Sequence, residues 1–249
     1  MQMMLEVKQL TGGYNPRRPV LHEVDFHVKP GEMVGLIGLN GAGKSTTIKH
    51  ILGLMEPQQG NIKIADVMLK ENSEKYRSAF AYVPETPILF DELTVEEHLR
   101  LTGMAYGVED KRYEQSIVQL LEQFQMTNKR QSFASHLSKG MKQKVMIMNA
   151  LLASPELFII DEPFLGLDPI GIRSLLEQLV QLKNDGAAIL MSSHILSTVE
   201  TYCDRLIILH QGKVVAQGTM EMIRHKAGAP FATANLEELF YHFTKEGAN

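Results

Sequence analysis

The chain has 249 residues, of which 44% are hydrophobic, and this suits one large globular domain or one core with a subdomain. Its 25 Lys and Arg against 29 Asp and Glu give a net charge of −4, which argues against binding nucleic acid through phosphates. The single cysteine, Cys203, excludes an internal disulfide and a multi-cysteine zinc site, and favours a reducing compartment such as the cytosol. We expect no secretory leader and no membrane span, since no stretch approaches ~20 apolar residues.

In the first part of the chain, short β-rich runs precede a glycine turn and a helix. Strands are predicted at 5–10, 24–28, 32–38, 61–67 and 80–85. The run 32–38 leads through the glycine turn into the helical segment 45–54, STTIKHILGL. A strand, a phosphate-sized loop and a helix therefore follow one another.

The middle of the chain, about 91–153, is almost wholly helical in its pattern and predicts an inserted helical subdomain. Thr94 followed by Glu97 is a capping-box signal for a helix that begins at Val95. Residues 110–124 carry apolar side chains at helical spacing, which predicts a second helix.

Strand patterns return at 157–161 and 187–193, each followed by a helical segment, which is the βαβ order of a parallel sheet. Residues 204–218 predict a hairpin, and the tail from about 219 predicts two short helices. Within the tail, 234–243 (ANLEELFYHF) is amphipathic.

Residues 38–46, GLNGAGKST, match the phosphate-loop pattern G-x-x-x-x-G-K-[ST] between a predicted buried strand and a helix. In such a loop, backbone N–H groups and the helix N-terminus face an anion, and the Lys44 ammonium reaches the β and γ phosphates. The Ser45 hydroxyl is then a ligand for Mg²⁺. A simple glycine-rich turn would not explain why Lys44 and the glycines occur together. The spacing of the glycines also differs from the G-x-G-x-x-G motif of dinucleotide-binding folds. The predicted ATP-binding residues here are Gly38, Asn40, Gly41, Gly43, Lys44, Ser45 and Thr46.

Two carboxylates, Asp161 and Glu162, end the apolar run LFIIDE, at the position where parallel sheets present ligands. We expect Asp161 to hold Mg²⁺ through water. Glu162 is the expected general base for the water that attacks the γ-phosphate, with Lys44 stabilising the transferred charge.

Residues 137–145, LSKGMKQKV, resemble the LSGGQ signature of ABC ATPases, with Leu137, Ser138 and Gly140 in register. Gly166–Pro169 resembles the D-loop, and His194 after a strand resembles the switch histidine of that family. Tyr14 stands where the family carries an aromatic residue that stacks on adenine. The order of these residues identifies the chain as a member of the ABC ATPase family; they are Tyr14, Lys44, Glu85, Ser138, Asp161, Asp168 and His194.

The resemblance implies an α/β fold: a P-loop NTPase core with a parallel sheet, an antiparallel β subdomain and a helical subdomain at about 86–156. It divides the chain into an ATP-binding domain, 1–230, and a short helical tail, 231–249. It also implies a homodimer, or a pair with a sister subunit, closed around two Mg-ATP. In each site one subunit supplies Lys44, Ser45, Asp161, Glu162 and His194, and the other supplies Ser138 and Gly140. Asp168 joins the nucleotide-binding residues, and Glu162, His194 and Lys44 are the catalytic ones.

Several of these residues have simpler readings when taken alone. Ser138 could merely cap a helix, Tyr14 could be a surface aromatic, and a lone histidine is most often a core hydrogen-bond partner. Glu85 replaces the usual Q-loop glutamine, so we expect it on the metal side or in coupling and not as the base. Lys139 and Met141 also depart from the signature, and we expect Lys139 to point to solvent.

The resemblance implies an ATP-hydrolysing subunit that powers transport through a separate membrane permease, from the cytoplasmic side of the membrane. Segments 35–55, 81–99 and 138–169 most resemble the ATP-binding subunits of Ecs-type transporters of Gram-positive bacteria, which implies export. The alternative is a soluble ABC ATPase that acts in an assembly process such as iron–sulfur cluster assembly. A nucleotide sensor without turnover is disfavoured by Glu162. No nucleic-acid partner and no metal centre beyond nucleotide-bound Mg²⁺ are expected.

Overall fold

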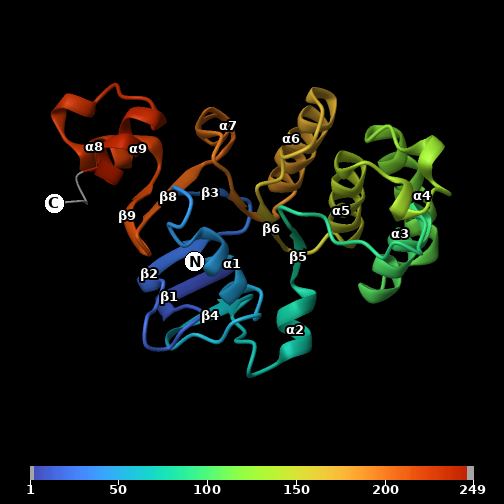
Figure 1. The fold of residues 1–249 in the computed structure, drawn as a ribbon, viewed down its shortest axis with the longest axis horizontal. Helices are drawn as coiled ribbons and strands as arrows, with labels where there is room; N and C mark the ends of the chain where they lie inside the picture. The colour runs from blue at the N-terminus through green and yellow to red at the C-terminus, as the bar shows by residue number, and fades with distance from the viewer. Residues whose placement is uncertain (1–2, 246–249) are drawn as a thin grey trace.

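A six-stranded sheet forms the centre of the computed structural model, which describes residues 3–245 (Figure 1). Its strands, in spatial order, are β5 (Phe80–Val83), β6 (Leu157–Asp161), β7 (Ala188–Ser192), β3 (Met33–Ile37), β8 (Arg205–His210) and β9 (Lys213–Gly218). The pairs from β5 to β8 are parallel, and β9 pairs antiparallel with β8. The predicted parallel sheet and the predicted hairpin at 204–218 are therefore confirmed.

A second, antiparallel sheet lies below the first in Figure 1 and has the order β2-β1-β4. Its strands are β1 (Leu5–Gly12), β2 (Leu21–Val28) and β4 (Gln59–Ile64). The prediction of a strand at 61–67 was wrong at both ends, because β4 begins two residues earlier and stops at Ile64. Ala65 and Asp66 have φ of 48° and 63°, and the backbones of Ile64 and Val67 bond to each other across this turn. Left-handed backbone at two successive residues cannot continue a strand.

The central sheet separates two hydrophobic cores. Alternate residues of β3 enter different cores: Met33 and Ile37 join the one that includes the helical subdomain, and Val34 and Leu36 join the one shared with the antiparallel sheet. This alternation follows from the two-residue period of a strand. Both faces of β3 are buried, which is why its run is continuously apolar. The strand therefore carries the loop that follows it on a rigid base.

Three helices flank the central sheet: α1 (Lys44–Ile51), α6 (Pro169–Asn184) and α7 (Leu196–Tyr202). In Figure 1, α6 and α7 rise on the side of the sheet away from the antiparallel strands. Helix α1 ends at Ile51, three residues short of the predicted segment. A further short helix, α2 (Ser73–Ser78), was not predicted; the Asn72 side chain caps it by accepting a hydrogen bond from Lys75 N.

Three helices form the helical part of the chain, which extends to one side in Figure 1. They are α3 (Val95–Ala105), α4 (Asp110–Gln123) and α5 (Lys139–Ala153). The predicted capping box is confirmed: Thr94 Oγ1 accepts from Glu97 N, and Glu97 Oε2 accepts from Thr94 N at 2.7 Å. The helices predicted near 95 and over 110–124 are thus present.

The C-terminal segment contains α8 (Met220–Ala227), a 3₁₀ turn at Ala229–Phe231 and α9 (Leu236–Lys245). Two helices were predicted here, and both are present. They pack on the hairpin β8–β9, and α9 also contacts α7. The division into domains at residue 230 stays a prediction. Within residues 3–245, no helix is both long and apolar enough to cross a bilayer.

Candidate active site

The loop between β3 and α1 has the backbone geometry of a phosphate cradle. Gly43 has φ +109°, and a Cβ there would lie 2.7 Å from Leu21 Cδ2, so the position needs glycine for both reasons. The Lys44 ammonium folds back and donates to the Gly38 carbonyl at 2.8 Å. Lys44 is 8% exposed, so its charge is held at the loop and not in bulk solvent. An anion in the loop would meet that ammonium at short range, where the local dielectric constant is low.

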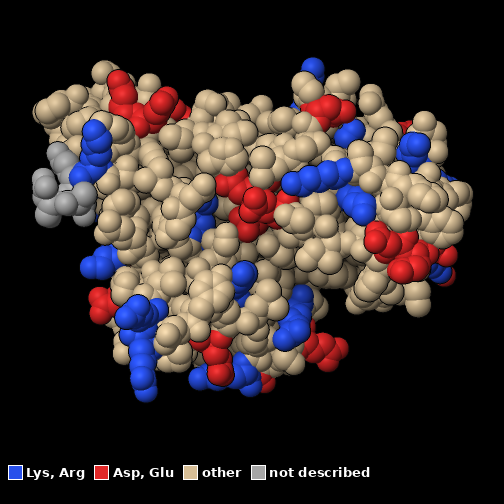
Figure 2. Space-filling model, in the orientation of Figure 1, with Lys and Arg blue, Asp and Glu red and all other residues tan. Residues whose placement is uncertain are grey.

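A pocket of about 790 Å³ opens over this loop. Eleven predicted site residues line it together: Tyr14, Gly38, Asn40, Gly41, Gly43, Lys44, Ser45, Thr46, Glu85, Glu162 and His194. They come from segments far apart in the sequence, and the parallel topology brings them to the carboxyl ends of the strands. Figure 2 shows acidic side chains gathered near the middle of the face drawn, over the ends of β5 and β6 in Figure 1. The pocket thus combines a cationic loop with acidic groups.

Asp161 ends β6, one residue before Glu162, and does not form part of the pocket lining. Its side chain is buried, and Oδ1 accepts a hydrogen bond from Ser192 Oγ at the end of the neighbouring strand β7. Burial raises the pKa of the Asp161 carboxyl above its ordinary value. The Ser192 hydroxyl and the Lys44 ammonium lower that pKa, whereas the nearby Glu162 and Glu85 carboxylates raise it further. The Asp161 carboxyl is therefore desolvated and lies near two other acidic side chains.

Replacing Asp161 by Asn is expected to raise the free energy of unfolding of the nucleotide-free protein at neutral pH. The amide removes a desolvated charge, and its oxygen still accepts from Ser192. The pKa of the Asp161 carboxyl is raised in the folded state. Its contribution to the free energy of unfolding is therefore fully present below its unfolded pKa of about 3.9, and it is lost as the pH rises through the folded pKa. The advantage of D161N therefore grows with rising pH.

Urea unfolding from about pH 4 to about pH 8 measures this advantage. The matched control is Asp185→Asn, an exposed position where the amide oxygen can still accept the hydrogen bond from Gln181 Nε2, and this variant should gain nothing. Equal stability of D161N and the wild-type protein at every pH would contradict the proposed burial cost.

Glu162 adopts a left-handed backbone with φ +46°, which is uncommon for a residue with a side chain. Its N–H donates to the carbonyl and the hydroxyl of Ser192, at 3.2 and 3.1 Å. Its Oε2 accepts from His194 N at 3.2 Å and lies 2.7 Å from His194 Nδ1. A carboxylate can only accept, so Nδ1 carries the ring proton in this pair. Glu162 is thus held at both its backbone and its side chain.

Tyr14 lies at the other end of the pocket, with 66% of its surface exposed. Lys49 Nζ donates to its hydroxyl at 3.0 Å and lies 5.1 Å from the ring centroid. The hydrogen bond from Lys49 lowers the pKa of the Tyr14 hydroxyl. An exposed ring anchored in this way is free to take up a planar base as a stacking partner.

The signature residues do not line this pocket. Ser138 Oγ caps α5 by accepting from Met141 N at 3.3 Å, and Gly140 packs so closely that a Cβ would lie 2.1 Å from the Gly166 carbonyl oxygen. Asp168 caps α6 by accepting from Gly171 N at 2.7 Å, and it pairs with Lys144 at 3.3 Å. A single chain therefore does not bring these three residues together with the phosphate loop.

Sequence reasoning missed several residues that shape the site. Ser192 orients both acidic residues, yet a serine at the end of an apolar run carries no signal of its own. Gln143 is fully buried on α5; its Nε2 donates to the Pro84 carbonyl at 3.1 Å, one residue before Glu85. Phe240 on α9 lines the pocket. The only available signal for Phe240 was the amphipathic pattern of its helix.

The sequence pattern of a family described as ABC transporter matches residues 21–165. The chain is 54% identical over 245 residues, 98% of each protein, to the ABC-type transporter ATP-binding protein EcsA of Bacillus subtilis. It is 36% identical over 219 residues to Nod factor export ATP-binding protein I of Rhizobium meliloti, covering 88% of this chain and 65% of that protein.

A solved ATP-binding subunit of an ABC transporter has a TM-score of 0.94 and 55% identity, covering 97% of this chain and 100% of that one. The fold alone is shared with CbiO1 of Clostridium perfringens, described as part of the complex CbiONQ, with a TM-score of 0.75, 23% identity and coverage of 97% and 98%. The predicted P-loop ATPase fold is therefore confirmed, and the chain belongs to the family of ABC transporter ATP-binding proteins, which hydrolyse ATP.

Proposed function

We propose that this ATPase powers export of a cargo through a separate membrane subunit, on the cytoplasmic face of the membrane. The observation that carries the proposal is the pocket in which Lys44, Glu162, His194 and Tyr14 meet. A cationic phosphate loop and a held carboxylate suit the positioning and charge stabilisation of phosphoryl transfer, and an exposed aromatic ring suits binding of the adenine base. The names of similar proteins, one a transporter subunit and one an export protein, support the transport role.

Each residue of the pocket would have its own role in phosphoryl transfer. Lys44 would leave the Gly38 carbonyl and donate to the β and γ phosphates. Glu162 would accept a proton from the attacking water, and His194 would hold Glu162 in place and face the γ-phosphate. Tyr14 would stack on the adenine ring.

Mg²⁺ fits the oxygen donors at the acidic end of the pocket. Within residues 3–245, no group of three or more His, Cys, Asp or Glu could hold a metal unaided, which suits an ion that keeps waters and phosphate oxygens as ligands. Ser45, Asp161 and Glu85 would hold it, and their excess negative charge favours a cation. When bound, Mg²⁺ neutralises charge on the phosphate oxygens.

A second nucleotide-binding subunit would complete the site. Ser138 and Gly140 begin α5, whose N-terminus is a source of positive potential, but they lie outside the pocket of their own chain. A homodimer, or a pair with a sister subunit, would place them over the γ-phosphate of the opposite chain. ATP would then hold the two halves together, and hydrolysis would release them.

Replacing Ser138 by Arg is expected to prevent this closure while leaving ATP binding to the single chain unchanged. The arginine side chain is too large for a position that must closely approach the phosphate of the opposite chain. ATP binding to the single chain should persist, because Ser138 does not line the pocket of its own chain. Fluorescent-nucleotide titration should give a dissociation constant within about twofold of wild type, and ATP-dependent dimers should be lost. A variant that still dimerises with Mg-ATP would contradict the assignment.

The membrane subunit would dock beside Glu85. Five apolar side chains are exposed on the loop after β5, on α3 and at its C-terminal end: Ile88, Phe90, Leu101, Met104 and Tyr106. His98 holds this loop, because its Nε2 accepts from Phe90 N at 2.9 Å and its Nδ1 donates to the Thr94 carbonyl at 2.8 Å. A short cytoplasmic helix of the permease would cover these side chains.

The experiment is to isolate tagged Glu162→Gln from detergent-solubilised membranes with Mg-ATP and to identify what co-purifies by mass spectrometry. A multi-span membrane protein that is lost when Phe90 and Met104 are both replaced by Asp is the expected result. Retention of only soluble assembly proteins would overturn the transport proposal and favour an assembly ATPase.

A further inference from the structure

Helix α9, close to the C-terminus, forms part of the wall of the ATP pocket. Its Phe240 lines the pocket together with Ser193, His194 and Leu196. The family match ends at residue 165, so this helix lies outside the segment that identifies the ATPase. Figure 1 shows α8 and α9 beside α7 and the end of β9.

Two features fix α9 in this position. Leu236 and Leu239 are fully buried, and they belong to the same core as Leu206 and Ile208 of β8. At the start of the helix, Asn235 Oδ1 accepts from Glu238 N and Glu238 Oε2 accepts from Asn235 N, each at 2.9 Å. This reciprocal pair is a capping box, so the helix begins at a defined residue. Phe240 is therefore presented by a rigid element.

Helix α9 is also bonded to α7, the helix that follows His194. The Glu200 carboxylate of α7 accepts from Leu236 N at 3.1 Å and lies 3.9 Å from Arg224 Nη2 on α8. Arg224 Nε donates to the Ala234 carbonyl at 2.8 Å, which ties α8 to the start of α9. The Glu200 side chain thus joins α7 to the C-terminal helices, and Leu196, at the other end of α7, lines the pocket together with Phe240.

The segment that carries His194 is fully buried at Ser193 but exposed at His194 itself. The His194 side chain is 57% exposed, and its ring and N–H both bond to one partner, Glu162. Helix α7 has seven residues, of which Val199 alone is buried. Leu196 and Phe240 are both partly buried against the same hydrophobic core. The position of His194 therefore depends on Glu162 and on the side chains that pack around Leu196.

We propose that Phe240 is a positioning residue for ATP hydrolysis: it supports the 193–196 segment and so keeps His194 in register with Glu162. The C-terminal helices then belong to the hydrolysis machinery, although they contact no part of the phosphate loop through hydrogen bonds. Loss of the aromatic ring would leave a space beside Leu196 and let His194 shift. A small displacement of a catalytic group lowers the rate of the chemical step more than it lowers substrate affinity.

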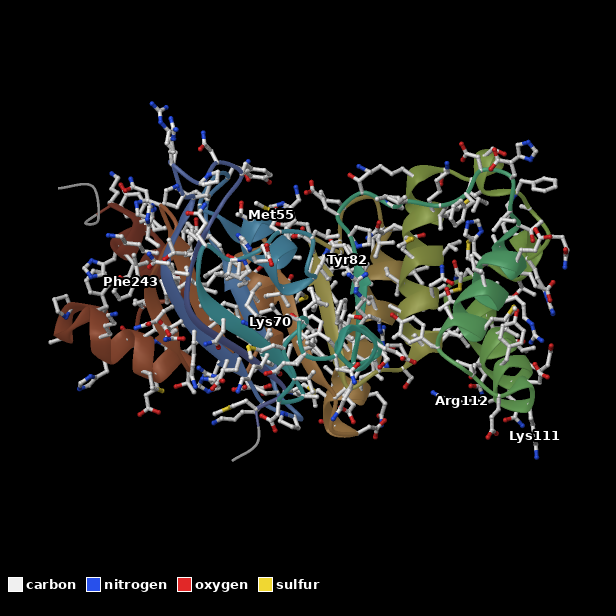
Figure 3. The ribbon with its side chains drawn as sticks, turned by 90° about the horizontal axis from the view of Figure 1, so that it is seen from below. Met55, Lys70, Tyr82, Lys111, Arg112 and Phe243 are labelled. Carbon is white, nitrogen blue, oxygen red and sulfur yellow. The ribbon has the colours of Figure 1, made fainter. Side chains whose placement is uncertain are left out.

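The test compares Phe240→Ala with Phe243→Ala, a partly buried phenylalanine of the same helix that does not line the pocket. Figure 3 labels Phe243 on this helix, at the opposite end of the molecule from Lys111 and Arg112. Phe240→Ala should lower kcat about tenfold with KM changed less than about twofold, because the effect acts through His194. Phe243→Ala should keep kcat within about twofold, and Phe240→Leu should restore most of the activity.

A double-mutant cycle with His194→Ala separates positioning from general loss of structure. In the His194→Ala background, Phe240→Ala should change kcat by less than about twofold, since the group that Phe240 positions is already gone. An equal loss in both backgrounds, an equal loss in Phe243→Ala, or a rise in KM at unchanged kcat would overturn the proposal. Hydrolysis and Mg-ATP binding by the wild-type protein, measured in parallel, test the ATPase activity itself. Failure of that activity can therefore be distinguished from failure of the proposed role of Phe240.

Discussion

Replacing Glu162 by Gln is expected to lower kcat for ATP hydrolysis about 10²–10⁴-fold, the range for removal of a general base. The amide cannot take a proton from water, but it can still accept the hydrogen bonds from His194 N and Nδ1. ATP binding should persist, since Lys44 and the glycine loop are untouched. Steady-state phosphate release and nucleotide titration measure the two effects separately.

The matched control is Glu156→Gln, an exposed carboxylate that directly precedes β6, whereas Glu162 directly follows it; Glu156 does not line the pocket. Its kcat should equal that of the wild-type protein. A Glu162→Gln variant that hydrolyses ATP within tenfold of wild type would place the base elsewhere, and Glu85, the other carboxylate in the pocket lining, would be the next residue to test.

Replacing Lys44 by Ala should weaken Mg-ATP binding about 10- to 100-fold. Hydrogen bonds to a charged group contribute about 1.5–3 kcal/mol each, and the buried Lys44 ammonium is the group proposed to donate to the phosphates. The folded state should survive, because the ammonium's present partner is a loop carbonyl that becomes accessible to water. Equilibrium binding of a fluorescent ATP analogue, with circular dichroism as a check on folding, measures the change.

Lys111→Ala is the control for Lys44→Ala. Lys111 is exposed on α4, far from the pocket, near Arg112 in Figure 3. Its removal changes the net charge by the same amount without touching the cradle. If both variants lost the same affinity, a general electrostatic effect would explain the result and the cradle assignment would fail.

The order of strands and helices could be predicted well where the pattern is local. The buried runs that became β3, β6 and β7 are continuously apolar because both faces are covered, and the Thr94–Glu97 box marks a helix start by chemistry within one turn. The end of β4 could not be predicted, since Ala65 and Asp66 adopt left-handed backbone that their residue types do not require. Helix α2 was not predicted because it is only six residues long, which is too short for a helical pattern of apolar residues.

The residues of the site also fall into those that a local sequence pattern predicts and those that it does not. Lys44, Asp161 and Glu162 occur in motifs whose local context predicts a role for each. The pocket gathers Lys44 and Glu162, and Asp161 ends β6 one residue before Glu162. Ser192, Gln143 and Phe240 act through contacts between segments far apart in the sequence, which no local pattern encodes. The roles assigned to Ser138, Gly140 and Asp168 depend on a second chain, and they remain predictions.

ATP is expected to join two such chains across their phosphate loops. Light scattering of purified Glu162→Gln, with and without Mg-ATP, tests it most directly, because this variant should bind ATP without consuming it. The expected mass is near that of the single 28.0 kDa chain without nucleotide and twice that value with Mg-ATP. A mass that stays at one chain in saturating Mg-ATP would contradict it.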